Sequence, residues 1–302
     1  MLDYIAEDVE LELSTYCNAD CPLCYRNYKT FDSHYPDHII RPLEEVINQL
    51  EGFPNLKYVR LVGSISEPTI YKDFHELVKY IKSRDVTIEI CTNGDTHGPE
   101  WWKKLSTLMN DKDSVYFSIC GSTQELHETY RKGTKLKNIL RNAEAFRSSD
   151  LNDYAQCIRF DYNDDDFNSN EFKELVNVFS NVYMTETFLL KDESNYKDTT
   201  NLNKLKPYQG KIQQYITVEK IANLKWKSPL KTTATCKAFN EKRLQIDVYG
   251  KEYPCYLFLE ASGGKPWDKD WNKIKNSQYE VCKFCEKSVV NLCDEKDLDY
   301  II

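Results

Sequence analysis

Three cysteines near the start of the chain have the spacing of a metal-binding loop. Cys17, Cys21 and Cys24 form a C-x3-C-x2-C pattern that follows a segment of alternating apolar and acidic residues. Three thiolates on one short loop can bind three irons of a four-iron cluster and leave the fourth iron open to a further ligand. A structural zinc site would need a fourth protein ligand, and the nearest histidines, His34 and His38, lack the usual finger spacing. The pattern therefore favours an iron–sulfur cluster with one open iron.

A second group of cysteines occupies the last part of the chain, at Cys236, Cys255, Cys282, Cys285 and Cys293. A β-hairpin expected over residues 243–257 would bring Cys236 and Cys255 together at its base. The C-x2-C turn of Cys282 and Cys285 can supply two more thiolates. Four thiolates fill every corner of a four-iron cluster, and they suit a tetrahedral zinc ion equally well. The spacing leaves both metals open and gives Cys293 no assigned role.

The composition is that of a globular protein and argues against several functional classes. The 302 residues are 41% hydrophobic and 29% charged, which is ordinary for a folded chain. The net charge of −8 repels phosphate backbones, so we expect no nucleic-acid partner. The sequence has no run of about 18 apolar residues, and its acidic start does not look like a signal peptide. We therefore expect no membrane span and a cytoplasmic location.

Eleven cysteines are many for a chain of this length. Disulfides are rare in a reducing cytosol, so ligation of metals or clusters explains the cysteines better. Three others, Cys91, Cys120 and Cys157, lie inside or beside apolar runs and are expected to be buried as small hydrophobic residues.

Strand and helix patterns alternate over the first 190 residues. Periodicity predicts strands at 9–13, 58–62, 86–91, 115–119, 154–160 and 182–190, and helices at 43–50, 74–81, 101–109, a stretch ending near 146, and 172–179. Such alternation predicts an α/β fold with parallel strands and crossover helices. About six βα units fit a partial barrel or an open sheet. We therefore predict an α/β domain at 1–190, a linker with an excursion loop at 191–235, and a small cysteine-rich β-hairpin/helix extension at 236–302.

The first cysteine loop resembles that of the radical S-adenosylmethionine (SAM) superfamily, because Leu23 precedes the third cysteine and Tyr25 follows it. The resemblance covers roughly residues 8–190 and implies a partial (β/α)6 barrel with this loop, including Leu23 and Tyr25, at the SAM site. It implies that the open iron of a 4Fe–4S cluster binds the amino and carboxylate groups of SAM. Reductive cleavage of SAM, with an electron from a flavodoxin- or ferredoxin-like protein, would then give a 5′-deoxyadenosyl radical that abstracts a substrate hydrogen.

Two further loops match positions where this family binds SAM. Residues 63–69 are similar to its Gly-Gly-Glu-Pro region, which hydrogen-bonds the methionine amino group, and this implies roles for Ser66 and Glu67. A plain strand-to-helix loop with a solvent-facing glutamate is the alternative. The segment after the third expected strand looks like the family's Thr-Asn-Gly turn, which implies that Thr92 and Asn93 lie near the ribose.

The region after the fourth expected strand also matches part of the family's sequence pattern. Ser118 and Arg131 match a pattern in which an arginine meets the SAM carboxylate, whereas Cys120 stands where the family often has an aspartate. A surface arginine at a helix start is the alternative. We expect His127 on a helix surface without a catalytic role, because the radical would abstract the hydrogen.

The C-terminal pattern C-x13-G-x4-C, from Cys236 to Cys255, is similar to the start of the SPASM extension of radical SAM enzymes. The chain has fewer cysteines there than the full extension, so it looks more like the shortened Twitch version. This resemblance implies an auxiliary 4Fe–4S cluster, held by Cys236, Cys255, Cys282 and Cys285.

These resemblances imply a radical SAM enzyme whose auxiliary cluster aids the oxidation of a small molecule. The first expected strand begins by residue 9, which leaves no room before it for a peptide-binding domain and favours a small substrate. Modification of a peptide or protein is the alternative within the enzyme class. A non-catalytic iron–sulfur or zinc scaffold, used for structure or electron transfer, is the alternative outside it.

Overall fold

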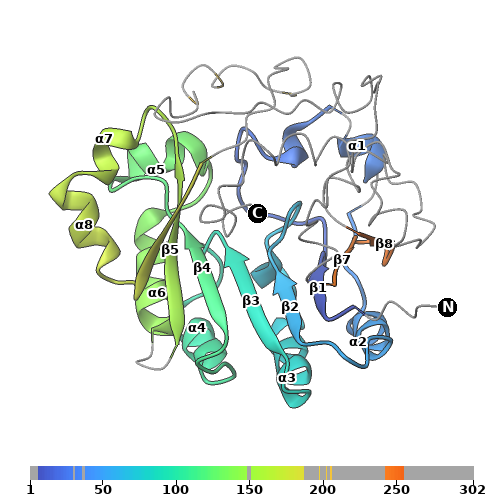
Figure 1. The fold of residues 1–302 in the computed structure, drawn as a ribbon. Helices are drawn as coiled ribbons and strands as arrows, with labels where there is room; N and C mark the ends of the chain where they lie inside the picture. The colour runs from blue at the N-terminus through green and yellow to red at the C-terminus, as the bar shows by residue number, and fades with distance from the viewer. Residues whose placement is uncertain are drawn as a thin grey trace, which may run out of the picture.

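Eight strands form one sheet in the computed structural model, which describes residues 6–29, 31–35, 38–147, 151–186, 197, 202, 205 and 242–254. The strands are β1 (Asp8–Leu11), β2 (Tyr58–Leu61), β3 (Thr87–Thr92), β4 (Ser114–Ser118), β5 (Asn152–Arg159), β6 (Asn181–Glu186), β7 (Arg243–Ile246) and β8 (Glu252–Tyr253). Their order across the sheet is β6-β5-β4-β3-β2-β1-β7-β8 (Figure 1). Every neighbouring pair is parallel except β7 and β8, which form an antiparallel hairpin.

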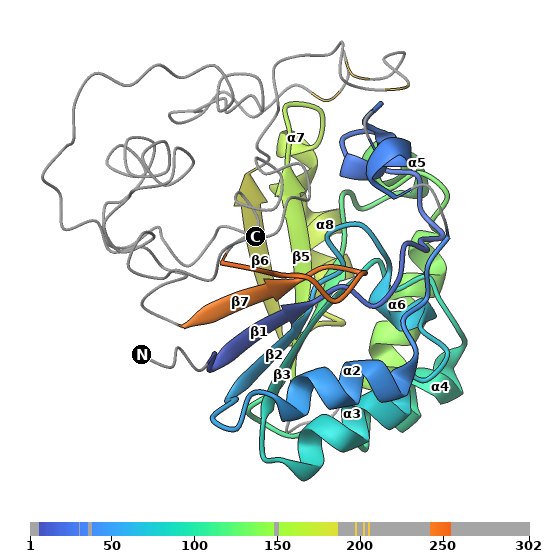
Figure 2. The same ribbon diagram turned by 90° about the vertical axis from the view of Figure 1, so that its right-hand side faces the viewer.

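Helices alternate with the parallel strands, as crossover connections require. They are the 3-10 helices η1 (Tyr25–Asn27) and η2 (Pro68–Ile70), and the α-helices α1 (Phe31–His34), α2 (Leu43–Glu51), α3 (Phe74–Ser83), α4 (Pro99–Ser106), α5 (Gln124–Tyr130), α6 (Leu136–Phe146), α7 (Asp164–Phe167) and α8 (Asn170–Val176). Figure 2 shows α2, α3, α4 and α6 on one face of the sheet. Within the part of the chain that the structure describes, no helix has the length and apolar character needed to cross a membrane.

The two faces of the sheet differ because side chains alternate along a strand. In β1, Val9 and Leu11 are buried in the main apolar core together with helix residues such as Leu50. Asp8 and Glu10 alternate with them and therefore lie on the face away from these helices. The helices thus cover an apolar face, and the opposite face of the sheet carries polar and charged side chains.

The expected α/β class with a parallel sheet is confirmed, and each strand predicted before residue 190 is present within a few residues of its predicted start. The stretch predicted to be helical up to residue 146 is divided into α5 and α6. Four short elements were missed, namely η1, α1, η2 and α7. Elements of this length cover about one helical turn, which is too little to show a periodicity.

The hairpin predicted at 243–257 is present in its described part as β7 and β8. The sequence did not predict that β7 would lie beside β1, with Asp8 aligned to Arg243 and Leu11 aligned to Ile246. Residues 191–235, apart from three positions, lie outside the described residues, and so does everything after residue 254. The division of the chain into domains therefore stays a prediction.

Candidate functional site

The predicted site residues follow the carboxyl ends of four adjacent parallel strands. The cysteine loop (residues 17–24) follows β1, and the loop containing Ser66 and Glu67 follows β2. Thr92 and Asn93 stand at the end of β3, and Ser118 ends β4. Because the strands are parallel, these ends meet at one edge of the sheet, where ligands bind in open α/β folds.

The three cysteines lie in one apolar cluster at this edge. Cys21 is buried, Cys17 and Cys24 are partly buried, and Leu23 and Tyr25 pack against the same group. The backbone N–H of Cys24 donates to the Cys21 carbonyl (3.0 Å), which closes the loop just before η1. Burial raises the pKa of Cys17 to about 12 and that of Cys24 to about 11, so the metal-free chain holds neutral thiols there. Bound iron would replace those protons, because thiolates are the metal ligands.

The donor set fits a cluster better than a single ion. No three His, Cys, Asp or Glu side chains among the described residues are arranged to hold one metal ion. A cubane needs a different arrangement, because each thiolate binds its own iron and the sulfurs therefore stand farther apart than around one zinc ion. The cysteine loop offers three thiols of this kind on one short turn.

The cysteine loop is connected to the loop after β3. Asn93 Nδ2 donates to Asn18 Oδ1 (2.8 Å) and lies 3.9 Å from Cys17 Sγ, within hydrogen-bond reach for sulfur. The Asn18 side chain in turn donates to the carbonyl of Asp95 (3.1 Å). The predicted SAM residue Asn93 is therefore brought to the cysteines.

Arg131 is brought to the same cysteines from the end of α5. Its Nη1 lies 3.8 Å from Cys21 Sγ as a hydrogen-bond donor, and the guanidinium charge also interacts with the buried Cys120 thiol. Its Nε is buried and has no partner among the described residues. The alternative of a plain surface arginine does not fit this placement.

The expectation that His127 lies on a helix surface is wrong. Its exposed fraction is 0%. Its Nδ1 accepts from the backbone N–H of Cys120 (3.2 Å), and its Nε2 pairs with the Thr134 hydroxyl (2.9 Å). Burial lowers the pKa of His127 to about 3, so the ring is neutral and holds the turn after β4 in place. The predicted burial of Cys91, Cys120 and Cys157 is confirmed.

Glu67 connects the loops after β1, β2 and β3. Its side chain is 2% exposed, and Oε1 accepts from the Thr69 backbone N–H (3.2 Å) and from the hydroxyls of Thr69 (2.6 Å) and Thr92 (2.7 Å). Oε2 accepts from the Asn93 N–H (2.7 Å), and the Glu67 backbone N–H donates to the Tyr16 carbonyl (2.8 Å). The carboxylate is therefore engaged by the chain itself and is not a solvent-facing group.

Gly63 fixes the start of the loop after β2. Its φ is +60°, and an added Cβ would collide with the Ser66 carbonyl oxygen and lie 2.8 Å from Pro68 Cδ. We expect Gly63→Ala to lower the free energy of unfolding by about 2–4 kcal/mol, because a left-handed backbone and a clash are both imposed on alanine. Urea denaturation would measure this loss. Gly98→Ala is the control, because a Cβ added at Gly98 would meet open space. This substitution should lower the free energy of unfolding by less than about 1 kcal/mol.

Glu12 is a site residue that the sequence analysis missed. The residue is 3% exposed, and its carboxyl group accepts from the Ile65 N–H (3.2 Å) and the Ser66 hydroxyl (3.0 Å). Burial raises the pKa of Glu12 to about 8. The strand alternation placed this residue on the polar face, but nothing in the sequence indicated that it would hold the loop after β2.

The raised pKa of Glu12 makes stability depend on pH. In the folded chain the Glu12 carboxyl group keeps its proton up to about pH 8, whereas in the unfolded chain it loses the proton near the ordinary glutamate pKa. The free energy of unfolding therefore falls as the pH rises from the unfolded-state pKa to the folded-state pKa. From pH 5 to pH 8 we expect the free energy of unfolding of the wild type to fall by about 2–4 kcal/mol more than that of Glu12→Gln. Urea denaturation of both proteins at several pH values would measure this. If the free energy of unfolding changed equally with pH in the wild type and in Glu12→Gln, the raised pKa of Glu12 would be contradicted.

The other predicted residues are placed as follows. The Thr92 hydroxyl also accepts from the Gly94 N–H (2.9 Å), and the Tyr25 ring stacks edge-on against Tyr28. Ser118 is buried at the end of β4. The remaining predicted ligands lie outside the described residues: Cys236, Cys255, Cys282 and Cys285.

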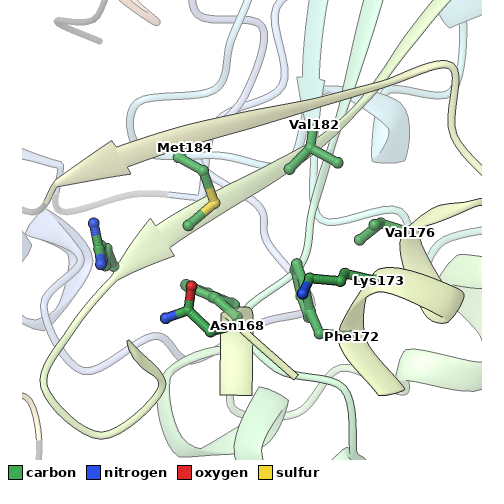
Figure 3. Close-up of a pocket in the computed structure, with 8 residues that line it drawn as sticks. Asn168, Phe172, Lys173, Val176, Val182 and Met184 are labelled. Atoms are coloured by element: carbon green, nitrogen blue, oxygen red, sulfur yellow. The ribbon is translucent and has the colours of Figure 1, made fainter. Parts of the chain in front are cut away.

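A pocket of about 300 Å³ lies away from these loops, between β6 and α8. Figure 3 shows Val182 and Met184 of β6 on one side and Phe172, Lys173 and Val176 of α8 on the other. No predicted site residue lines it, and we give it no role in the chemistry.

The fold and this edge define an α/β protein with a parallel sheet, a cysteine loop after β1, and a buried Glu67 that connects the loops after β1, β2 and β3. Residues 11–178 match the family model of the Radical SAM superfamily, and the chain belongs to that superfamily. It is a radical SAM enzyme, with SAM and a 4Fe–4S cluster as cofactors, and the α/β class found here is that of the partial radical SAM barrel.

Individual relatives match over shorter stretches. The chain is 31% identical over 109 residues to the tungsten-containing aldehyde ferredoxin oxidoreductase cofactor-modifying protein of Pyrococcus furiosus, which is 36% of this chain and 29% of that protein. It is 31% identical over 121 residues to mycofactocin maturase MftC of Mycobacterium tuberculosis, which is 40% of this chain and 29% of that protein. The matched part thus spans less than a third of either relative.

Solved structures share the fold over most of the chain. The crystal structure of Streptococcus suis SuiB aligns with a TM-score of 0.60 and 16% identity, over 99% of this chain and 76% of that one. Native anSMEcpe, with bound AdoMet and the Cp18Cys peptide, aligns with a TM-score of 0.51 and 19% identity, over 91% of this chain and 88% of that one. At these identities the likeness concerns the fold alone.

Proposed function

We propose that Cys17, Cys21 and Cys24 hold the 4Fe–4S cluster, and that SAM binds at the loops after β2 and β3. The observation that carries this proposal is the set of contacts from Asn93 and Arg131 to the cysteine sulfurs. Bound there, the cluster would supply the electron for reductive cleavage of SAM, which is the source of radical chemistry on a substrate.

The chain's own residues position these groups. Arg131 places a positive charge beside Cys21 and Cys120, where it offsets the negative charge of a thiolate. Glu67 fixes Thr92 and the Asn93 backbone, so that the turn after β3 faces the cysteine loop in one geometry. Because the carboxylate of Glu67 is already engaged, the backbone carbonyls of residues 63–66 are the candidates for the SAM ammonium group.

The direct test is cleavage of SAM by the protein after anaerobic reconstitution with iron and sulfide. With dithionite in place of the natural flavodoxin- or ferredoxin-like donor, we expect 5′-deoxyadenosine and methionine to form. Cys157→Ala is the control, because Cys157 packs in the main core and not in the side-chain cluster of the three cysteines, and it should keep this activity. A protein that carries the cluster and SAM but forms no 5′-deoxyadenosine contradicts the proposal.

We further propose that residues 236–302 form a Twitch- or SPASM-type extension with an auxiliary cluster on Cys236, Cys255, Cys282 and Cys285, following the barrel at 1–190 and the linker at 191–235. The hairpin supports this, because β8 ends at Tyr253, two residues before Cys255. An auxiliary cluster suits the two-electron oxidation of a small molecule, since it can accept the second electron.

Modification of a peptide is the second candidate. MftC is named a maturase, and one structure of SuiB is of the enzyme bound to the precursor peptide SuiA. Addition of candidate precursor peptides or of small alcohols to the reconstituted enzyme distinguishes the two. The true substrate should become modified and should increase the formation of 5′-deoxyadenosine.

A further inference from the structure

The face of the sheet away from α2, α3, α4 and α6 carries a row of polar side chains in register. Gln245 of β7 is aligned with Glu10 of β1, Glu10 with Arg60 of β2, and Arg60 with Glu89 of β3. Leu244 and Ile246, which flank Gln245 in β7, belong to the apolar core, so Gln245 lies on the polar face. The row therefore runs across four adjacent strands at one level.

The central part of this row is internally satisfied. Arg60 pairs with Asp8 (3.1 Å) and with Glu89 (2.7 Å), so its guanidinium has two carboxylate partners. These contacts join β1, β2 and β3, and they explain why charged groups are retained on this face. Arg60 is consequently occupied by the protein itself.

The Gln245 end of the row is not satisfied. Gln245 is 2% exposed, and neither its Nε2 nor its Oε1 has a hydrogen-bond partner in the structure as described. Glu10, beside it, accepts one hydrogen bond among the described residues, from the Ser64 hydroxyl (3.2 Å). A buried amide with both its donor and its acceptor unpaired is costly, and such groups in native proteins call for an explanation.

We propose that Glu10 and Gln245 form a substrate subsite that binds the amide groups of a substrate, such as those of an extended peptide. An ammonium group would satisfy Glu10 and Gln245 Oε1 but would leave Nε2 unpaired. A carboxylate has no N–H to donate and would leave Oε1 unpaired. In an extended peptide the N–H and the C=O of one residue point to the same side of the backbone, so together they can pair with both atoms of the Gln245 side chain, and a further N–H can donate to Glu10.

The position of the pair supports a role in substrate binding. Glu12 is two residues beyond Glu10, just past the end of β1, and its carboxyl group holds Ile65 and Ser66 of the loop where we place SAM. Ser64 of that loop contacts Glu10 directly. A substrate amide at Glu10 and Gln245 would therefore lie next to the proposed SAM loop, and the inference rests on the proposed function in this respect.

The first test is the melting temperature of the reconstituted enzyme with SAM. If Gln245 is kept for a ligand, Gln245→Leu removes an unpaired amide and should raise Tm by about 2 °C or more. Gln49→Leu is the matched control, because Gln49 donates to the Gly250 carbonyl (3.0 Å) and accepts from Arg41 (2.6 Å), and it should lower Tm. A Gln245→Leu protein that melts lower or fails to fold overturns the proposal, because the amide would then be structural.

The second test uses acetyl-triglycine N-methylamide as an amide probe at millimolar concentration. We expect it to raise the Tm of the wild type and to have at least a tenfold weaker effect on Gln245→Leu. No shift in the wild type, equal shifts in both proteins, or a shift only with putrescine or glucose overturns the amide assignment. Formation of 5′-deoxyadenosine in the same preparations separates the two proposals: SAM cleavage without probe binding removes the subsite alone.

Discussion

A chain in which Cys17, Cys21 and Cys24 are all replaced by alanine is expected to form no 5′-deoxyadenosine and to bind about four fewer irons than the wild type. The three thiols lie in one cluster of side chains and are the only cysteines of the described residues that share one loop. Without them no iron is held next to Asn93 and Arg131. Iron analysis, together with chromatography of the SAM products, measures both effects.

The iron that remains in this variant tests the C-terminal cysteines. About four irons per chain would support a second cluster on Cys236, Cys255, Cys282 and Cys285, because a cubane has four irons. Iron near zero would remove the auxiliary cluster and leave a one-cluster enzyme. Cys157→Ala should match the wild type in iron content, and an equal loss of iron in this control would mean that misfolding, rather than ligand removal, explains the result.

The sequence predicted those features of the fold and site that local patterns encode. Alternation of apolar and polar residues predicted β1 to β6, and spacing alone indicated the cysteine loop. Contacts between distant segments could not be predicted in this way. The pairing of β7 with β1 joins residues about 235 positions apart, and no local pattern specifies such a partner.

The roles of single polar residues were hidden for the same reason. His127 is a polar residue of a short helix, but it lies on the buried face of that helix with Tyr130, and the turn after β4 supplies the Cys120 N–H. Glu12 alternates with apolar residues like any half-exposed strand position, and the loop after β2 contacts its carboxyl group. A sequence pattern gives the face on which a side chain lies, whereas its burial depends on which loop returns to cover it.

Glu67→Ala is expected to lower the free energy of unfolding by about 3–5 kcal/mol, because buried donors on Thr69, Thr92 and Asn93 would lose their acceptor. The turn after β3 would also lose its fixed position beside the cysteine loop. We therefore expect SAM cleavage to fall by about tenfold or more even when the cluster is fully loaded, since small displacements of binding groups have large effects on rate. Urea denaturation and the rate of 5′-deoxyadenosine formation measure the two effects.

Two further variants distinguish a structural role of Glu67, in which it holds Thr92 and Asn93 in place, from a direct role in binding SAM. Glu67→Gln keeps one acceptor oxygen, so it should recover part of the stability and part of the rate together if the carboxylate acts by holding Thr92 and Asn93. Glu76→Ala is the surface control, because Glu76 is exposed and pairs only with Lys79 among the described residues, and its change should stay within about 0.5 kcal/mol. If Glu67→Gln regained full stability while SAM cleavage stayed at the level of Glu67→Ala, the carboxylate would have to act on SAM itself. The hydrogen bonds to Thr69, Thr92 and Asn93 would then be insufficient to explain its burial.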